Sequence, residues 1–230
     1  IQDLLPDEVV PPSTGALLEV MGTLIDAKDP YTGGHSRRVA HLAAVTAGIL
    51  GLDTRVQGSA RAAGHLHDLG KLAIPLRLLT KTTVLDPSEI QRIRGHTTGG
   101  ARTLTRIPLL RHLAAGARYH HERWDGQGYP EGLSREHIPI IPRILSVCDS
   151  YDAMTSARAY RNARTHRQAM EEIRDSSGSQ FDPSIVEAFL AVPEETFRDL
   201  RRGSAALKES ERARERAQRE VASLDFPASA

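Results

Sequence analysis

The stretch His67-Asp68-Leu69-Gly70-Lys71 decides how the rest of the chain is interpreted. It places an imidazole beside a carboxylate, a pair that can hold a divalent cation through mixed nitrogen and oxygen ligation. Gly70 is expected to end a helix in the left-handed conformation, so that the amine of Lys71 turns back over the bound ion. Two ligands do not make a metal site, so other parts of the chain must supply the rest.

Other histidines and aspartates supply these ligands. The chain has ten histidines, and several lie near predicted helix ends or on faces that can share one centre. The candidate ligands are His35, His67, Asp68, His96, His120, His121 and Asp149. Such nitrogen and oxygen ligands suit Fe, Mn, Zn, Co or Ni better than Cu(I). Seven ligands are too many for one ion, but they suit two ions if Asp68 bridges the pair. Two ions that acidify a bridging water are the usual device for in-line attack on a phosphate ester.

The remaining histidines are interpreted as ordinary side chains, because a lone histidine is more often structural or exposed than a ligand. They are His41, His65, His112, His137 and His166. His120 and His121 diverge by ~100° on a helix, so both reach one centre only at its frayed end or by binding different ions. Asp149 lies among apolar residues, and a buried carboxylate needs a partner or a metal. Asp152, on the same face, is expected behind the ligands or facing the substrate.

Composition favours packed helices, because hydrophobic residues make up 40% of the chain and aromatic residues only 4%. The net charge of +1 gives no general reason to expect a nucleic acid polymer or an anionic membrane as partner. Cys148 is the only cysteine and lies in an apolar run, which predicts a core thiol, no intrachain disulfide and a cytoplasmic location. No apolar run approaches the ~18 residues of a membrane span.

Helix signals along the chain predict an all-α fold. Helices are expected from about Ser13 to Ala27, from His35 to near Gly51, from Asp53 to Gly70, from Asp86, from His96, from Pro108 to His121, from Arg143 to Ser156, and from Thr165, Asp182 and Pro193. Residues 123–142 hold several glycines and prolines and are expected to form a long ordered loop, a feature that is often functional.

Three parts of the chain are distinguished by composition. Residues 1–12 carry acid and proline and are interpreted as the end of a linker from an upstream region. Residues 13–202 form the main domain. Residues 203–230 are rich in Arg, Glu and Ala and form a charged helical tail. The tail is interpreted as a solvated helix packed on the domain, with a weak oligomerisation helix as the alternative.

Taken together, these motifs resemble the HD-GYP family, a branch of the HD-domain phosphohydrolases. The resemblance is carried by residues 29–35, 67–75, 120–130, 149–161 and 179–183, in the family's order and spacing. The Gly128-Tyr129-Pro130 loop separates this branch from other HD proteins. The resemblance implies an HD-domain helical bundle with a long Gly-Tyr-Pro loop and a C-terminal helical extension. The implied activity is hydrolysis of cyclic di-GMP at a metal centre, which yields linear pGpG, or GMP after a second cut.

The resemblance also implies roles for individual residues. The seven candidate ligands match family metal ligands, and Lys71 matches the lysine that contacts the scissile phosphate. Tyr129 matches the tyrosine beside the substrate. Arg158 and Arg161 match positions where basic residues meet phosphates or guanines. Asp29 is expected to touch the substrate or a metal-bound water.

Two divalent ions per chain are predicted, with Fe or Mn first and Zn, Ni or Co as alternatives. Asp68, as the bridge, and Lys71 are the predicted catalytic residues. Family members with a third metal have a glutamate four residues before the first histidine, as the resemblance has it, where this chain has Tyr31. A phenol with a pKa near ~10 is a poor ligand, so pGpG is the predicted main product.

Other interpretations stay open. One is a catalytically silent HD-GYP domain that binds the nucleotide and signals through partner contacts, which the complete ligand set and Lys71 disfavour. Another is an HD phosphohydrolase for a different nucleotide, such as cyclic GMP-AMP. The expected partners are cyclic di-GMP, a second copy of the chain, an upstream sensor or receiver domain, and a GGDEF-type protein.

Overall fold

The computed structural model describes residues 12–28, 33–156 and 163–203. The chain divides into one unit that ends at Val192 and a second that begins at Pro193, and each is described by itself. In the second unit the described residues are helical over 194–203. The predicted end of the main domain, residue 202, falls within that helix.

In the first unit the described residues form helices joined by loops, and the elements among them include no β-strand. The α-helices are α1 (Pro12–Lys28), α2 (His35–Ile49), α3 (Thr54–Leu66), α4 (Leu76–Leu79), α5 (Pro87–Thr105), α6 (Ala114–Tyr119), α7 (Ile140–Thr155), α8 (His166–Asp175) and α9 (Pro183–Leu190). Short 3-10 helices are η1 (Leu69–Ala73), η2 (Pro108–Leu113) and η3 (Arg135–His137). The all-α prediction is confirmed.

Several helices begin at caps that the sequence predicts. Asp86 and Glu89 form a complete capping box at the start of α5, and Thr165 and Gln168 form one at α8. Asp182 accepts the backbone N–H of Ser184 at the start of α9. Each cap satisfies N–H groups that the first helical turn leaves without a partner.

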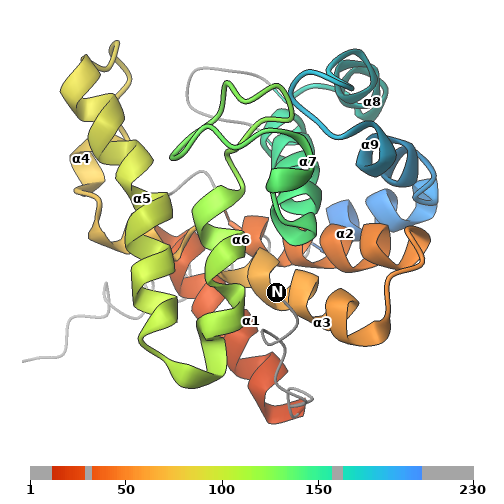
Figure 1. The fold of residues 1–230 in the computed structure, drawn as a ribbon, viewed down its shortest axis with the longest axis horizontal. Coiled ribbons are helices and arrows are strands. Elements are labelled where there is room, and N and C mark those ends of the chain that lie inside the picture. Colours follow the sequence, from red (N-terminus) through yellow and green to blue (C-terminus); the bar gives the residue numbers. More distant parts are fainter. Residues whose placement is uncertain (1–11, 29–32, 157–162, 204–230) are drawn as a thin grey trace, which may run out of the picture. The chain divides into compact units, whose positions relative to one another are not determined.

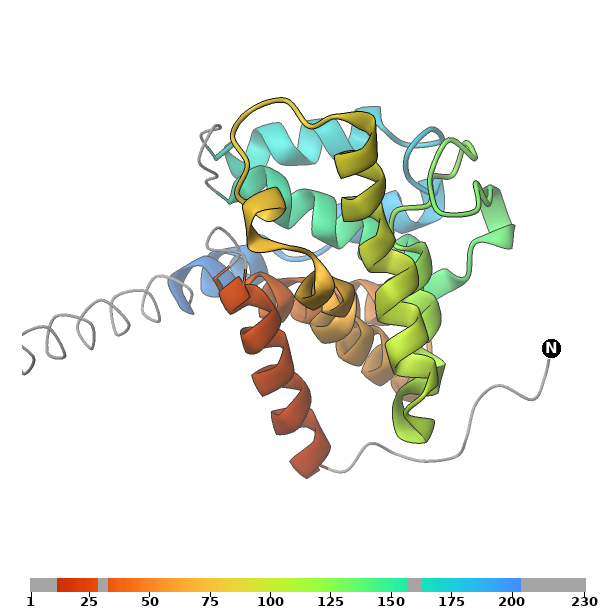
Figure 2. The same ribbon diagram turned by 90° about the vertical axis from the view of Figure 1, so that its left-hand side faces the viewer.

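Aliphatic side chains form the core, as the composition predicts. α2 packs along α3, α7 packs against both, and α5 lies beside α6 (Figure 1). α1 packs against α2 and α3 (Figure 2). Leu42, Leu66, Ile144 and Leu145 are fully buried, and Cys148 is buried with them. None of the described helices is long and apolar enough to cross a membrane.

Three helix predictions near the candidate ligands are wrong. The helix expected from Pro108 to His121 is a 3-10 helix, η2, followed by α6, which ends at Tyr119. α3 ends at Leu66, and Gly70 lies in η1 without a left-handed conformation. The glycine is required for a different reason, since a Cβ there would lie 1.8 Å from the carbonyl oxygen of His96. His96 does not open a short helix but lies inside α5. The missing side chain at Gly70 therefore lets η1 lie directly against the middle of α5.

Candidate metal centre

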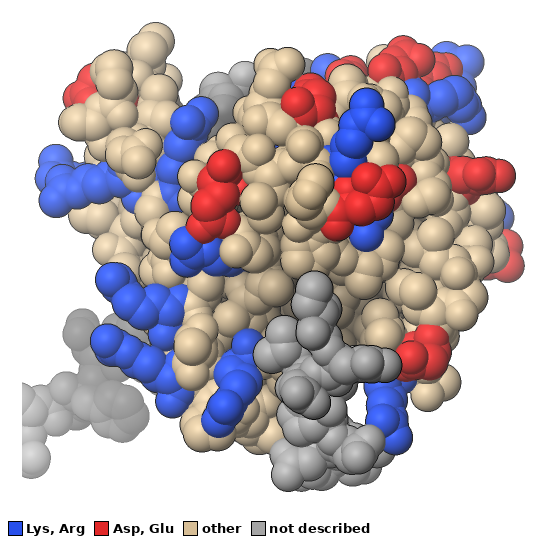
Figure 3. All heavy atoms as spheres, viewed as in Figure 1, with Lys and Arg blue, Asp and Glu red and all other residues tan. Residues whose placement is uncertain are grey.

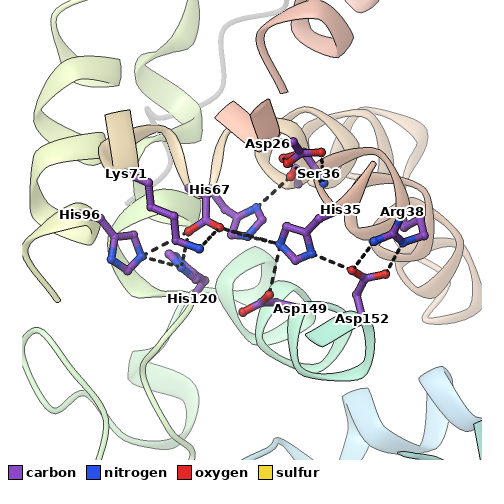
Figure 4. Close-up of polar contacts among 12 residues, drawn as sticks. Asp26, His35, Ser36, Arg38, His67, Lys71, His96, His120, Asp149 and Asp152 are labelled. Atoms are coloured by element: carbon purple, nitrogen blue, oxygen red, sulfur yellow. Dashed lines mark hydrogen bonds and ion pairs between the residues drawn. The ribbon is translucent and has the colours of Figure 1, made fainter. Parts of the chain in front are cut away.

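Five helices bring the candidate ligands to one centre. His35 begins α2, His67 and Asp68 follow α3, His96 lies within α5, His120 and His121 follow α6, and Asp149 lies on α7. Figure 4 shows the rings of His35, His67, His96 and His120 turned toward one another. Three sets of residues have ligand atoms within 4.8 Å of one another and could each hold an ion. One consists of His67, Asp68 and His120 and shares a histidine with each of the other two sets. We name the other two sets the His35 group (His35, His67 and Asp149) and the His96 group (His96, His120 and His121).

Asp68 lies between the two groups. Its Oδ2 lies 3.8 Å from Nε2 of His35 and 3.4 Å from Nε2 of His67. Its Oδ1 lies 3.4 Å from Nε2 of His96 and 3.9 Å from Nε2 of His120. Each carboxylate oxygen therefore faces a different group, which is the placement that a bridging ligand needs.

Backbone carbonyls orient three of the imidazoles. Nδ1 of His67, His96 and His120 each donates to the carbonyl three residues earlier, at 2.9, 2.7 and 3.0 Å. A carbonyl oxygen only accepts, so Nδ1 carries the proton and Nε2 presents a lone pair. This sets the tautomer that a metal-ligating histidine requires.

The Nε2 atoms of the imidazoles converge. Nε2 of His35 lies 3.3 Å from Nε2 of His67, and Nε2 of His96 lies 3.3 Å from Nε2 of His120. Oδ1 of Asp149 lies 3.3 Å from Nε2 of His35. Nε2 of His96 and of His120 are both acceptors, and two buried acceptors that face one another are unfavourable unless a cation lies among them. The donor set therefore fits divalent metal ions with nitrogen and oxygen ligands.

His35 differs from the other imidazoles, because a carboxylate holds its Nδ1. Oδ2 of Asp152 accepts from Nδ1 of His35 at 2.8 Å, and both carboxylate oxygens accept from Arg38. Burial alone would lower the pKa of His35, but Asp152, together with Asp149 and Asp68, raises it to about 9. Asp152 is only 2% exposed. Of its two predicted positions, the structure places Asp152 behind the ligand His35, and its contact with the substrate stays a prediction.

The imidazoles of the His96 group are kept neutral. Burial and then the neighbouring imidazoles hold the pKa of His120 well below its usual range. Burial lowers the pKa of His121 to about 4, although Asp149 opposes this. Burial also lowers the pKa of His96. Neutral imidazole is the form that binds a metal, so this group is ready for an ion at neutral pH.

Lys71 lies against the carboxylate of Asp68, although Gly70 does not turn the chain in the expected way. Nζ of Lys71 donates to Oδ2 of Asp68 at 2.6 Å. Burial would raise the pKa of Asp68, but Lys71 and then the surrounding imidazoles hold it well below its usual range. The carboxylate is therefore ionised and the half-buried amine carries its counter-charge.

The Gly-Tyr-Pro loop reaches the centre through Tyr129. Its ring stacks on that of His121, with centroids 4.9 Å apart and an interplanar angle of 28°. The guanidinium carbon of Arg94 lies 4.7 Å from the centroid of the Tyr129 ring. Arg94 was not among the predicted site residues. The signal that could have found it is its position on α5, two residues before the ligand His96.

Residues from two other motifs hold this loop. Backbone N–H groups of Trp124 and Asp125 donate to the carbonyls of Gln180 and Ser179. Glu122 is buried and accepts from the backbone N–H groups of residues 131 and 132, at 2.8 and 3.1 Å. The motif at 179–183 therefore anchors the loop that carries Tyr129, and the sequence had not indicated this role.

Some predicted residues lie outside the described part of the chain. These are Asp29, Tyr31, Arg158 and Arg161, and their roles stay predictions. The five histidines interpreted as ordinary side chains take no part in the ligand groups found among the described residues. His166, for example, contacts the hydroxyl of Tyr151 through Nδ1 at 2.8 Å.

Comparison with known proteins agrees with this architecture. Residues 19–185 match the family described as HD domain. The chain is 41% identical over 181 residues to a cyclic di-GMP phosphodiesterase of Thermotoga maritima, covering 78% of this chain and 49% of that protein. It is 32% identical over 192 residues to a 3'3'-cGAMP-specific phosphodiesterase of Vibrio cholerae, covering 82% of this chain and 42% of that protein.

Solved structures show the same fold at low identity. A cyclic GMP-AMP-specific phosphodiesterase of V. cholerae superimposes with a TM-score of 0.63 and 20% identity, covering 81% of this chain and 50% of that chain. The chain belongs to the HD-domain family, in the HD-GYP branch that its motifs resemble. It spans about half the length of the curated relatives that it matches.

Proposed function

We propose that the chain is a metal-dependent phosphodiesterase that hydrolyses cyclic di-GMP to linear pGpG. The observation that carries the proposal is the pair of ligand groups on either side of Asp68, each of which brings buried Nε2 atoms together. Support also comes from the similarity to the Thermotoga maritima protein, which is named a cyclic di-GMP phosphodiesterase.

The His35 group would hold one divalent ion and the His96 group a second, with Asp68 shared between them. The nitrogen and oxygen ligands favour Fe or Mn and also accept Zn, Ni or Co. When bound, two such ions acidify a water and neutralise charge on the phosphoryl oxygens. Asp152 would orient His35 and make it a stronger ligand, because a carboxylate partner raises the basicity of the ring.

Lys71 would bind the scissile phosphate from the open side of the bridge. Its amine already lies against Asp68, so a short movement of a flexible side chain would bring it to a phosphoryl oxygen. There the cation would stabilise the charge that develops in the transition state. Tyr129 would contact the substrate at the rim, and Arg158, Arg161 and Asp29 are proposed as further contacts.

Cyclic GMP-AMP is the second candidate substrate. The observation that favours it is the 32% identity to a protein named for specificity toward 3'3'-cGAMP. The two cyclic dinucleotides share the phosphodiester ring and differ in one base, so the metal centre itself would accept both. Discrimination would depend on contacts to the bases, which are made outside the centre.

The test is anaerobic purification, metal analysis, and assay on both cyclic dinucleotides. We expect about two ions per chain, in keeping with the two ligand groups, and pGpG as the main product. Faster turnover of cyclic GMP-AMP than of cyclic di-GMP would identify cyclic GMP-AMP as the substrate and leave the proposed reaction unchanged. Tight nucleotide binding with bound metal and no hydrolysis would show a silent receptor, and absence of bound metal would overturn the proposal.

A further inference from the structure

Arg94 completes a stack that runs from the metal ligands to the surface. His121 lies against the Tyr129 ring, and the guanidinium of Arg94 lies 4.7 Å from the centroid of the same ring. His121 and Arg94 therefore both contact the Tyr129 ring. Arg94 itself is exposed. A positive charge is therefore held at a fixed place on the rim, one ring away from a candidate metal ligand.

Other cations close to the centre are already paired with carboxylates. Lys71 bonds to Asp68 at 2.6 Å, and Arg38 bonds to Asp152 at 2.5 Å. Within the described residues, Arg94 makes no ion pair with an Asp or Glu side chain. Its charge is thus available to an anion from solution.

The sequence around Arg94 explains why it lacks an acidic neighbour. No Asp or Glu occurs between Glu89 and Glu122, a stretch that holds six arginines. Glu89 is engaged by Lys81 at 2.5 Å. In Figure 3, Lys and Arg side chains gather along the edge where α5 and α6 run. Helical neighbours one turn away from Arg94 are therefore neutral, which keeps the guanidinium from being neutralised within its own helix.

We propose that Arg94 binds the second phosphate of the cyclic dinucleotide, the one that is not being cleaved. This inference rests on the proposed function, because it takes a ring with two phosphodiesters as the ligand. When one phosphate is at the metal centre, the other is held by the ring at a short, fixed separation from it. A guanidinium offers two parallel N–H donors to phosphate oxygens, and its contact with Tyr129 orients it before the ligand arrives.

The stack also restricts how Tyr129 meets the substrate. Because the ring of Tyr129 already contacts His121 and Arg94, we expect it to leave little free surface for a base to stack on. The phenol would then contact the substrate through its hydroxyl edge. Tyr129 thus has two tasks in the proposal: it presents Arg94 and it offers a hydrogen bond.

The experiment compares Arg94→Ala and Arg94→Lys with Arg92→Ala, an exposed arginine on the same helix two residues earlier. Steady-state kinetics are measured on the metal-loaded chain with cyclic di-GMP and with bis(p-nitrophenyl) phosphate, which has a single phosphate. For Arg94→Ala we expect KM for cyclic di-GMP to rise about tenfold, the effect of losing one charge-assisted contact, with little change in kcat. Metal content and turnover of the small diester should stay as in the parent.

The conservative variant gives a second readout. Arg94→Lys keeps the charge but loses the planar fork, so it should recover part of the KM effect. Arg92→Ala should behave as the parent. An unchanged KM for cyclic di-GMP in Arg94→Ala would overturn the proposal. Equal losses of metal and kcat on both substrates would instead show that Arg94 only supports His121 through Tyr129.

Calorimetric binding separates this proposal from the proposed activity. If the parent binds cyclic di-GMP without cleaving it, weaker binding by Arg94→Ala than by Arg92→Ala supports the role of Arg94 although the activity is refuted. If the parent cleaves cyclic di-GMP and both variants match it, the activity stands and the role of Arg94 is refuted. A parent that neither binds nor cleaves the dinucleotide overturns both.

Discussion

The two ligand groups on either side of Asp68 are built from similar residues but are supported differently. In the His35 group a buried carboxylate, Asp152, holds the imidazole of His35, and Arg38 holds Asp152. In the His96 group, backbone carbonyls hold His96 and His120. The pKa of His35 is raised to about 9, whereas that of His121 is lowered to about 4.

This difference indicates that the two proposed ions would not be equivalent. A carboxylate behind a ligating histidine makes the ring a stronger electron donor, whereas a neutral carbonyl does so less. The His35 group should therefore bind its ion more tightly than its ligand count alone suggests. The His96 group depends instead on close packing between η1 and α5, where Gly70 meets the carbonyl of His96.

The largest effect is expected from Asp68→Ala, which removes the carboxylate that both groups share. Both ions should be lost, and turnover of cyclic di-GMP should fall by at least about 10³-fold, equivalent to about 4 kcal/mol. Metal analysis and the kinetic assay measure the two effects. Asp175→Ala, which changes an exposed carboxylate at the end of α8, is the matched control. Two ions per chain in Asp68→Ala would refute the bridge.

Gly70→Ala tests the packing on which the His96 group depends. A Cβ 1.8 Å from the carbonyl oxygen of His96 forces η1 and α5 apart, which should lower the free energy of unfolding by about 3 kcal/mol or more. Urea denaturation of the metal-free chain measures this change in the free energy of unfolding.

Gly95→Ala is the control, because a Cβ there meets nothing within 4 Å. This substitution should stabilise α5 by about 0.5–1 kcal/mol. Equal stability of the two variants would contradict the close approach.

Removing one ligand from each group sharpens the comparison. His35→Ala and His96→Ala should each leave about one ion per chain, because each disrupts one group and keeps the other, with turnover reduced by about 10²-fold. Metal analysis of the purified variants is the measurement. If either substitution alone releases all the metal, the two groups serve a single ion and the count of two is wrong.

Asp152→Asn is expected to have the smallest effect and to act on one group only. Loss of a carboxylate behind a metal-ligating histidine typically weakens metal binding by about 10–100-fold. Titration of the metal-free chain should show one binding step weakened and the other unchanged. Weakening of both steps would mean that Asp152 acts through the fold, for instance by leaving buried Arg38 without its carboxylate.

Much of this architecture follows from short-range signals in the chain. Capping boxes at Asp86 and Thr165 mark helix starts because the side chain and the N–H groups it accepts lie within one turn. The types of metal ligand follow from the residues themselves, since histidine and aspartate are the side chains that bind such ions at neutral pH. These features need no knowledge of how the helices pack.

Packing between distant segments decided the rest. Local conformation alone predicts a left-handed helix end at Gly70. Its role in the structure depends instead on α5, a separate helix that comes so close to Gly70 that no side chain fits there. The same holds for Asp152, which one-turn periodicity placed on the face of Asp149 without showing that His35 and Arg38 would enclose it. Arg94 meets Tyr129 only because α5 and the Gly-Tyr-Pro loop are brought together. Contacts of this kind depend on which helix faces meet, and that is set by burial of the whole core rather than by neighbours in sequence.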